Sequence, residues 1–169
     1  MNTSSAVISD CGQYRFRLDR FVASEGKVFN FIGVNPSTAD ATLNDATVRK
    51  WIGFTKKNGG SRFIVTNLFG YRATDVNELK VMTDPFGPLN SRYMLNAVME
   101  ADIIVPCWGN SNKMPKSLRS HAYNTFEFLK SMVGQIPGKK LMTFGYTKGG
   151  DPLHPLMLGY STELQEVPL

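Results

Sequence analysis

The chain has 169 residues, of which 42% are hydrophobic and 20% are charged, a composition that excludes a disordered or low-complexity protein. This length suits a single folded unit, so we predict one domain over residues 1–169. Lys and Arg number 19 against 14 Asp and Glu, and the net charge of +5 favours a phosphate-bearing partner, either a nucleic acid or a nucleotide. A solvated surface that is merely basic is the competing explanation of this charge.

Several classes of protein are excluded by what the sequence lacks. It has neither the pattern of a signal peptide nor the ~18 apolar residues of a membrane span, so we expect a cytoplasmic protein. The 2 cysteines, Cys11 and Cys107, stand far apart and suit reduced thiols. A four-cysteine iron–sulfur cluster and a multi-histidine zinc site are excluded, and we predict no metal and no cofactor. P-loop, dinucleotide-binding and serine-hydrolase motifs are also missing.

The first half of the chain predicts three strands and a helix. Residues 14–21 alternate apolar and charged side chains, which indicates a half-buried, antiparallel strand at the edge of a sheet. Residues 27–35 form a denser apolar run that Pro36 stops, as in a buried strand. A helix follows, with Asp45 as its N-cap and glycines at its end. Residues 62–71 repeat the pattern of a buried strand.

The second half predicts further helices and two more strands. Asp75 opens one or two helical turns over residues 75–82, and residues 87–101 have the apolar spacing of an amphipathic helix. Residues 102–109 form a short strand that ends on glycine. A helix follows within residues 120–136, and we expect His121 to precede it as a surface or capping residue. Residues 139–146 form a fourth buried strand.

Alternating strands and helices predict an α/β domain with a mostly parallel sheet, because parallel neighbours need crossover helices. Ligands of such sheets bind at the C-terminal ends of the strands. We therefore expect the polar residues that follow the strands to converge. They are Asn35, Ser37 and Asp40 after the first buried strand, Asn67, Arg72 and Asp75 after the second, Trp108 and Asn110 after the third, and the loop 147–155 after the fourth.

Asn35, Pro36 and Ser37 form the first candidate site. An Asn held by a proline at the end of a strand can orient a water molecule, and a nearby carboxylate such as Asp40 can accept its proton. The same residue types also turn chains and cap helices, which is the structural alternative.

Two further segments are candidates. The Asn67 amide can pair with the edge of a nucleobase, and Arg72 can bind a carboxylate or a phosphate, unless it pairs locally with Asp75. His154 is one of 2 histidines and lies between two prolines, in a loop that suits a proton donor or an electrostatic stabiliser. A structural or surface role is the alternative for a lone histidine.

Five blocks of the sequence, in this order, resemble domain-of-unknown-function family 1643, an uncharacterised bacterial and phage family. They are FIGVNPSTADATLNDATVRKW, NLFGYRATD, GPLN, CWGN and GYTKGGDPLHPL, and they span nearly the whole chain. The family label itself implies no activity.

The placement of these blocks is also distantly similar to the uracil-DNA glycosylase superfamily, which implies a three-layer α/β/α sandwich around a four-stranded parallel sheet. The resemblance implies that Asn35 positions water, that Asn67 recognises a base edge, and that His154 stabilises the departing base. Phe69, Tyr71 or Trp108 would then provide a stacking face. Leu156 follows the His-Pro pair, where the superfamily loop commonly has Ser.

These observations lead to one hypothesis and two rivals. The hypothesis is a nucleobase-recognising enzyme that hydrolyses an N-glycosidic bond in DNA or in a modified nucleotide. Its candidate catalytic residues are Asn35, Asp40 and His154, and its candidate binding residues are Pro36, Ser37, Asn67, Phe69, Tyr71, Arg72, Trp108 and Asn110. One rival is a protein that sequesters a nucleotide or modified base without turnover. The other is a base-modifying transferase that uses Asp40 or Asp45.

Overall fold

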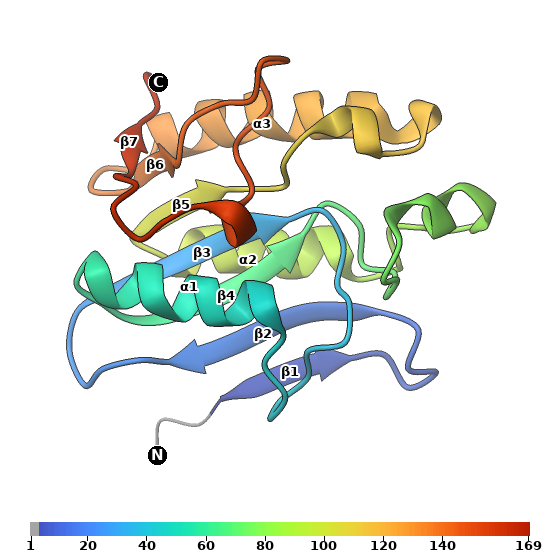
Figure 1. The fold of residues 1–169 in the computed structure, drawn as a ribbon, viewed down its shortest axis with the longest axis horizontal. Coiled ribbons are helices and arrows are strands. Elements are labelled where there is room, and N and C mark those ends of the chain that lie inside the picture. The colour runs from blue at the N-terminus through green and yellow to red at the C-terminus, as the bar shows by residue number, and fades with distance from the viewer. Residues whose placement is uncertain (1–3) are drawn as a thin grey trace.

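The structure is a computed structural model and describes residues 4–169. Its centre is a seven-stranded mixed sheet with the strand order β1-β2-β4-β3-β5-β6-β7 (Figure 1). The strands are β1 (Ser5–Ile8), β2 (Arg15–Phe21), β3 (Lys27–Gly33), β4 (Gly60–Asn67), β5 (Ile103–Pro106), β6 (Lys140–Thr143) and β7 (Gln165–Glu166). The predicted α/β class is therefore confirmed, with a larger sheet than expected.

The four central strands β4, β3, β5 and β6 are parallel. Each connection between consecutive strands of this group contains a helix, as parallel pairing requires. These helices are α1 (Ala46–Lys57) after β3, α2 (Asn90–Glu100) after β4 and α3 (Arg119–Gly134) after β5. The predicted parallel core is thus present. Its strands begin and end within a few residues of the expected positions.

The predicted edge strand is not at the edge. β2 does pair antiparallel with β4, as expected, but β1 pairs antiparallel with its other side. The register of the β1–β2 pair shifts between Val7 and Ile8, so that Val7 faces Arg17 and Ile8 faces Arg15. The polar and charged residues that suggested an edge are instead used in contacts with loops and helices. β7 closes the other edge, antiparallel to β6.

Helices cover both faces of the sheet, and the two faces differ in composition (Figure 1). On the α1 face, aromatic side chains dominate and pack against one another: Phe29, Phe31, Trp51, Phe54, Phe63 and Phe144. On the face of α2 and α3 the cluster is mainly aliphatic, with Ile32, Leu68, Val98, Ile104, Leu129 and Leu141. The core thus has two halves that meet only through the sheet.

Capping side chains fix where the helices begin. The Asp45 carboxylate accepts a hydrogen bond from the Val48 N–H at 2.8 Å, which confirms the predicted N-cap of α1. Asp75 caps a short 3-10 helix, η1 (Val76–Val81), with a capping box to Glu78. Three more short 3-10 helices complete the fold: η2 (Ser111–Lys113), η3 (Lys116–Leu118) and η4 (Pro155–Met157). Within residues 4–169, none of the helices has both the length and the apolar character that crossing a bilayer requires.

Candidate functional site

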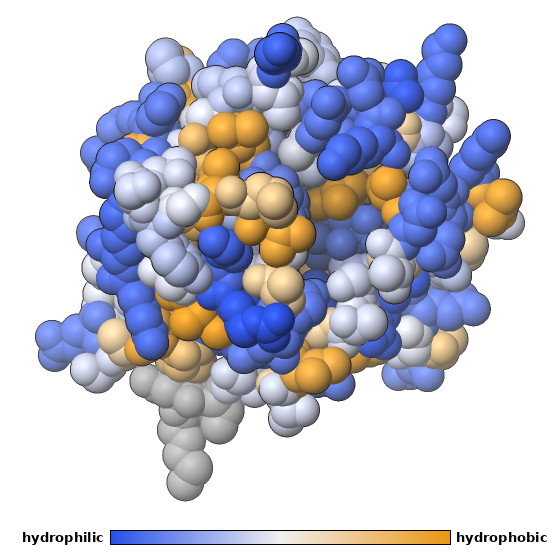
Figure 2. All heavy atoms as spheres, viewed as in Figure 1, coloured by the Kyte–Doolittle hydropathy of each residue, from blue (hydrophilic) through white to orange (hydrophobic). Residues whose placement is uncertain are grey.

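The sheet has a topological switch point between the adjacent strands β3 and β5, because the connections that follow these two strands lead to opposite sides. The chain leaves β3 through α1 to reach β4 on one side, and it leaves β5 through α3 to reach β6 on the other. Such a switch point opens a crevice at the C-terminal ends of the two strands, which is where ligands of open α/β sheets bind. Seen from the α1 face, the surface is largely hydrophilic, with hydrophobic side chains around a hollow near the centre of the view (Figure 2).

A small cavity of about 50 Å³ lies at the end of β3 and β4. The predicted residues Asn35, Ser37, Asn67 and His154 all line it, although they come from three separate loops and strands. The full lining is Arg15, Gly33, Val34, Asn35, Ser37, Asp45, Thr47, Trp51, Asn67 and His154. The expectation that polar residues from several strand ends converge is therefore met for four of the candidates, which form the "polar cavity" below.

The Asn35 side chain is fixed by the neighbouring loop. Its Nδ2 donates to the carbonyl oxygen of Ala73 at 2.7 Å and to that of Pro36 at 3.2 Å. The Pro36 carbonyl in turn accepts from the Ala73 N–H at 2.9 Å. Because the amide nitrogen is held, the Asn35 Oδ1 is oriented and has no donor among residues 4–169. It can accept a hydrogen bond from a water molecule or a ligand.

Among residues 4–169, Asp45 contributes the one carboxylate in the lining of the polar cavity. Its Oδ1 accepts from Val48 N–H at 2.8 Å and its Oδ2 accepts from Ser37 Oγ at 3.0 Å. The same side chain therefore starts α1 and holds the loop after β3. These two bonds also commit Ser37, which was predicted to bind substrate, to a structural partner.

His154 is held in one tautomer. Its Nδ1 accepts a hydrogen bond from the Leu156 N–H at 3.2 Å, so the neutral ring carries its proton on Nε2. Burial, followed by the positive charge of Lys113, lowers its pKa below the usual 6.5, although Asp45 opposes this shift. The ring is therefore neutral at pH 7 and can donate from Nε2. Gly109, at φ +78°, makes room for it, because a Cβ there would lie 3.1 Å from the His154 Cβ.

Asn67 ends β4 and is almost fully buried, with 3% exposure. Gly33 on β3 leaves the space that its side chain occupies, since a Cβ at Gly33 would lie 2.7 Å from the Asn67 Oδ1. Behind it, the Asn90 Nδ2 donates to the carbonyl oxygens of Asn67 and Leu68 at 2.9 and 3.2 Å. The backbone at this strand end is therefore fixed from the opposite face of the sheet.

Arg15 lines the polar cavity and was not predicted from the sequence. The residue is 3% exposed, and its one side-chain hydrogen bond within residues 4–169 runs from Nη1 to the Ala39 carbonyl oxygen at 2.6 Å. Burial lowers its pKa to about 10, with Asp45 opposing the shift, so the guanidinium stays charged at pH 7. The shift in register between β1 and β2 gives Arg15 this position. A period-2 sequence pattern carries no signal of such a shift, so the sequence could not reveal the role of Arg15.

A larger pocket of about 390 Å³ adjoins the polar cavity and shares Val34 and His154 with it. The predicted residues Trp108 and Asn110 line this pocket, together with Lys113. Trp108 is 4% exposed and its indole N–H has no protein acceptor within residues 4–169. The Asn110 Oδ1 accepts from the Asn112 N–H at 2.8 Å and so caps η2.

Phe69, Asp40 and the predicted binding residue Pro36 lie outside the linings of both spaces. Phe69 is fully buried and packs against Phe86 and His121 on the α2 and α3 side of the sheet, so it offers no stacking face to a ligand. Asp40 accepts from the N–H groups of Thr42 and Leu43 at 2.9 and 2.8 Å, and these bonds lower its pKa. The Asp40 carboxylate therefore stabilises the turn over residues 40–43, and it does not line the polar cavity.

Tyr71 and Arg72 line a third, open pocket of about 440 Å³ on the other side of Ser37. The Arg72 Nη1 donates to the Gly12 carbonyl oxygen at 3.2 Å, and its Nε reaches that of Ser37 at 3.5 Å. The local ion pair considered for Arg72 and Asp75 is absent from the described part of the chain. These two side chains therefore lie beside the polar cavity and not in it.

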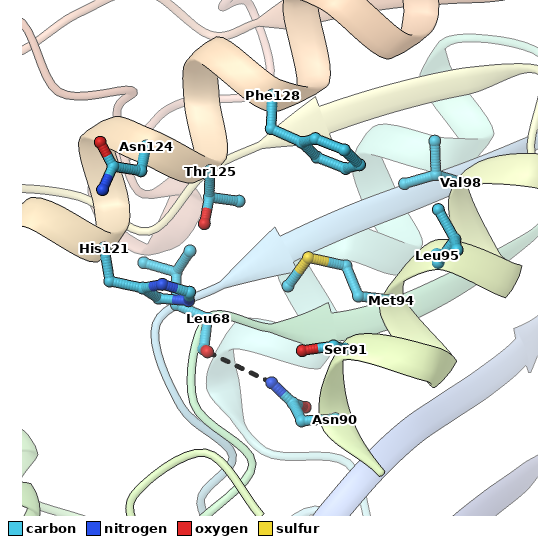
Figure 3. Close-up of a pocket in the computed structure, with 10 residues that line it drawn as sticks. All are labelled: Leu68, Asn90, Ser91, Met94, Leu95, Val98, His121, Asn124, Thr125 and Phe128. Carbon is cyan, nitrogen blue, oxygen red and sulfur yellow. Dashed lines mark hydrogen bonds between the residues drawn. The ribbon is translucent and has the colours of Figure 1, made fainter.

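A separate cavity of about 370 Å³ lies between α2 and α3 on the opposite face of the sheet (Figure 3). Its lining is uncharged and mostly apolar, and it includes Leu68, Met94, Val98 and Phe128. His121 lies here, inside α3 and packed against aromatic rings, and not at the surface before the helix as predicted. Burial lowers its pKa. We call this space the apolar cavity.

The remaining reactive groups do not form a second site. Cys11 and Cys107 are free thiols, and burial raises the pKa of Cys107 to about 12. Within residues 4–169, no cluster of three or more His, Cys, Asp or Glu side chains is arranged to hold a metal ion.

Comparison with known proteins identifies the family and nothing finer. No curated protein and no solved structure matches the chain. A family model described as "Protein of unknown function (DUF1643)" matches residues 15–156. This span begins at Arg15 and includes His154, so it contains every residue of the polar cavity. The chain therefore belongs to the DUF1643 family.

Proposed function

We propose that this protein recognises a nucleobase and hydrolyses its N-glycosidic bond, in DNA or in a modified nucleotide, with an arrangement like that of the uracil-DNA glycosylases. One observation carries the proposal: Asn35, Asn67 and His154 lie at or beyond the C-terminal ends of different parallel strands and line one cavity. The four parallel strands with helices on both faces, which the resemblance implied, support it further.

The sizes of the two spaces suggest how a nucleotide lies in them. The polar cavity has room for only a few polar atoms, because one water molecule in the liquid takes roughly 30 Å³ and the cavity measures about 50 Å³. We assign it to the polar edge of the base, with the Asn67 amide as donor and acceptor. The rest of the nucleotide extends into the adjoining pocket, past Val34 and His154, toward Trp108.

Hydrolysis needs a positioned water molecule and a stabilised leaving group. The Asn35 Oδ1 accepts a hydrogen bond from water, whose oxygen forms a bond to the sugar C1′. The bond from C1′ to the base nitrogen breaks, and its electron pair leaves with the base. His154 donates from Nε2 to the anion that forms, and the proton lost by the water is transferred to solvent or to the base. The proposed mechanism therefore relies on electrostatic stabilisation of the leaving group and needs no strong base.

A basic groove supports a phosphate-bearing substrate. It has a volume of about 650 Å³ and adjoins the larger pocket through Lys113 and Met114. Lys80, Lys113, Lys116 and Arg119 line it, and no carboxylate does. None of the four forms an ion pair within residues 4–169. Unpaired cations beside the pocket favour the phosphates of a nucleotide or nucleic acid.

The test is release of a free base, measured by mass spectrometry. Purified protein is incubated with single- and double-stranded DNA that carries uracil, mismatches or modified bases, and with a panel of free nucleotides. We expect one base to be released by the wild type and its release to be lost in Asn35→Ala. Asn124→Ala, which changes an asparagine in the apolar cavity, is the matched control. Equal rates in wild type and Asn35→Ala would contradict the mechanism.

The sequestering alternative is favoured by a different observation. Asp45 is the one carboxylate in the lining of the polar cavity, and both of its oxygens already accept hydrogen bonds. A protein that only binds needs no free general base. Stoichiometric retention of a nucleotide without release of base would establish this alternative. The transferase alternative has weaker support, because Asp40 lies outside the cavity and Asp45 is engaged.

A further inference from the structure

The guanidinium of Arg15 has an unused edge. Nη1 is anchored on the Ala39 carbonyl oxygen, whereas Nε is fully buried and has no acceptor. Nη2 likewise makes no hydrogen bond to any of residues 4–169. Nε and Nη2 form one side of the planar group, and their two N–H bonds are nearly parallel. Arg15 therefore presents a two-donor edge without a protein acceptor.

The nearby carboxylates do not use this edge. Asp45 and Asp40 are close enough to act on the charge of Arg15, but neither is within ion-pair distance. Asp45 is bound by Ser37 and Val48, and Asp40 by the backbone of its own turn. An unpaired donor in a buried guanidinium is costly unless a partner satisfies it. The lining position of Arg15 makes a ligand in the polar cavity the available partner.

The carboxylate in the lining of the cavity favours one of two kinds of partner. A phosphate or carboxylate matches a two-donor edge, and Arg72 and Arg20 add positive charge nearby, but inside the cavity such an anion would meet the carboxylate of Asp45. An uncharged group with two adjacent acceptors avoids this repulsion. Among nucleobases, a 6-oxopurine has this arrangement at O6 and N7, which is the edge that arginine recognises with two hydrogen bonds. Adenine has an amino group at the corresponding position and would oppose donor with donor.

We propose that Arg15 selects a 6-oxopurine, guanine or a close relative, by donating from Nε and Nη2 to its O6 and N7. This inference rests on the proposed function, because it assumes that the polar cavity takes the edge of a base. Arg15 then completes the recognition with Asn67, which lines the same cavity. Only the edge of the purine enters the polar cavity, and its remainder lies in the adjoining pocket.

The first experiment needs no mutation. Isothermal titration calorimetry compares deoxyguanosine monophosphate with its 7-deaza analogue, which lacks the N7 acceptor, and with 2-aminopurine deoxyribonucleotide, which lacks O6. We expect each analogue to bind about 10-fold more weakly, as for loss of one good base contact, and deoxyadenosine monophosphate to bind more weakly still. Equal affinities for the guanine nucleotide and both analogues would overturn the proposal. So would displacement of deoxyguanosine, which carries no phosphate of its own, by inorganic phosphate alone.

Variants then locate the selectivity. Arg15→Lys keeps the charge but removes the two-donor edge, so the preference for guanine over its 7-deaza analogue should disappear. Arg49→Lys is the matched control, because Arg49 is exposed on α1 and lies outside the polar cavity. Unchanged selectivity in a folded Arg15→Lys protein would contradict the assignment.

The failure of this inference is distinguishable from failure of the proposed function. Guanine-selective binding without release of base removes the hydrolase but leaves the role of Arg15 intact. Release of a pyrimidine, with no selectivity among purines, retains the hydrolase and removes the role of Arg15.

Discussion

Two neighbouring residues at the end of β4 line two different cavities, one on each face of the sheet. Asn67 lines the polar cavity on one side of the sheet, and Leu68 lines the apolar cavity between α2 and α3 on the other. The polar cavity is the smaller by far, about 50 Å³ against about 370 Å³, yet its lining holds the charged side chains Arg15 and Asp45 and four of the predicted site residues. The comparison teaches that charged and polar side chains from several strand ends, and not volume, mark the candidate site in this fold.

The largest expected effect concerns the apolar side of this comparison. Leu68 is fully buried, and Leu68→Ala should lower the free energy of unfolding by about 3 kcal/mol through lost burial and a new void. Leu95→Ala, at a residue of the same cavity that is 43% exposed, should cost much less. Urea denaturation measures both. Equal losses of unfolding free energy in the two variants would contradict the prediction that burial of Leu68 sets the larger effect.

The two histidines provide the next contrast. His154→Ala should reduce base release about 100-fold, because it removes a donor to the leaving group. His121→Ala should leave the rate nearly unchanged, since His121 lies in the apolar cavity. Single-turnover rates, with circular dichroism to verify folding, test this pair. A similar loss of rate in both variants would place the chemistry elsewhere.

Gly33→Ala tests the fit around Asn67. The new Cβ would lie 2.7 Å from the Asn67 Oδ1, so the amide must move away from its position in the polar cavity. We expect about 10-fold weaker binding of the base, roughly 1.4 kcal/mol, with little loss of stability. Gly149→Ala is the control, because its Cβ would meet nothing closer than 3.7 Å. Titration calorimetry gives the affinities, and unchanged binding in Gly33→Ala would remove Asn67 from recognition.

The smallest expected effect is that of pH on stability. The pKa values of His121 and His154 both lie below the ordinary 6.5, mainly because both rings are buried. The unfolded chain therefore takes up these protons first as the pH falls, and folded stability is lost from about pH 6.5 downward through the lower, folded pKa values. Urea midpoints between pH 7.5 and 5 should fall, and they should fall less in His154→Gln. A flat profile would contradict the lowered pKa values.

The parallel core could be predicted from the sequence because its signals are local. Dense apolar runs stopped by Pro36 or a glycine gave the buried strands, and Asp45 gave the start of α1. From that order alone, Asn35, Asn67 and His154 were expected to meet, and they do. Strand order and residue type were sufficient for this part of the site.

The errors arose where a contact between distant residues decides the outcome. Alternation along β2 predicts that Arg15 shares a face with Arg17. The register shift against β1 separates them, so that Arg15 reaches the loop at Ala39 while Arg17 pairs with Glu100 on α2. Phe69 was one of three candidates for a stacking face, but its ring is fully buried against Phe86 and His121. Neither outcome is contained in local periodicity.

The amide of Asn90 links the two cavities mechanically. It belongs to the first turn of α2, and its two hydrogen bonds end on the carbonyl oxygens of Asn67 and Leu68. A sideways displacement of α2 would therefore pull directly on the backbone that carries Asn67. The stiffness of the polar cavity therefore depends on a helix that contributes no residue to its lining, so that packing on one face of the sheet holds the geometry of the other.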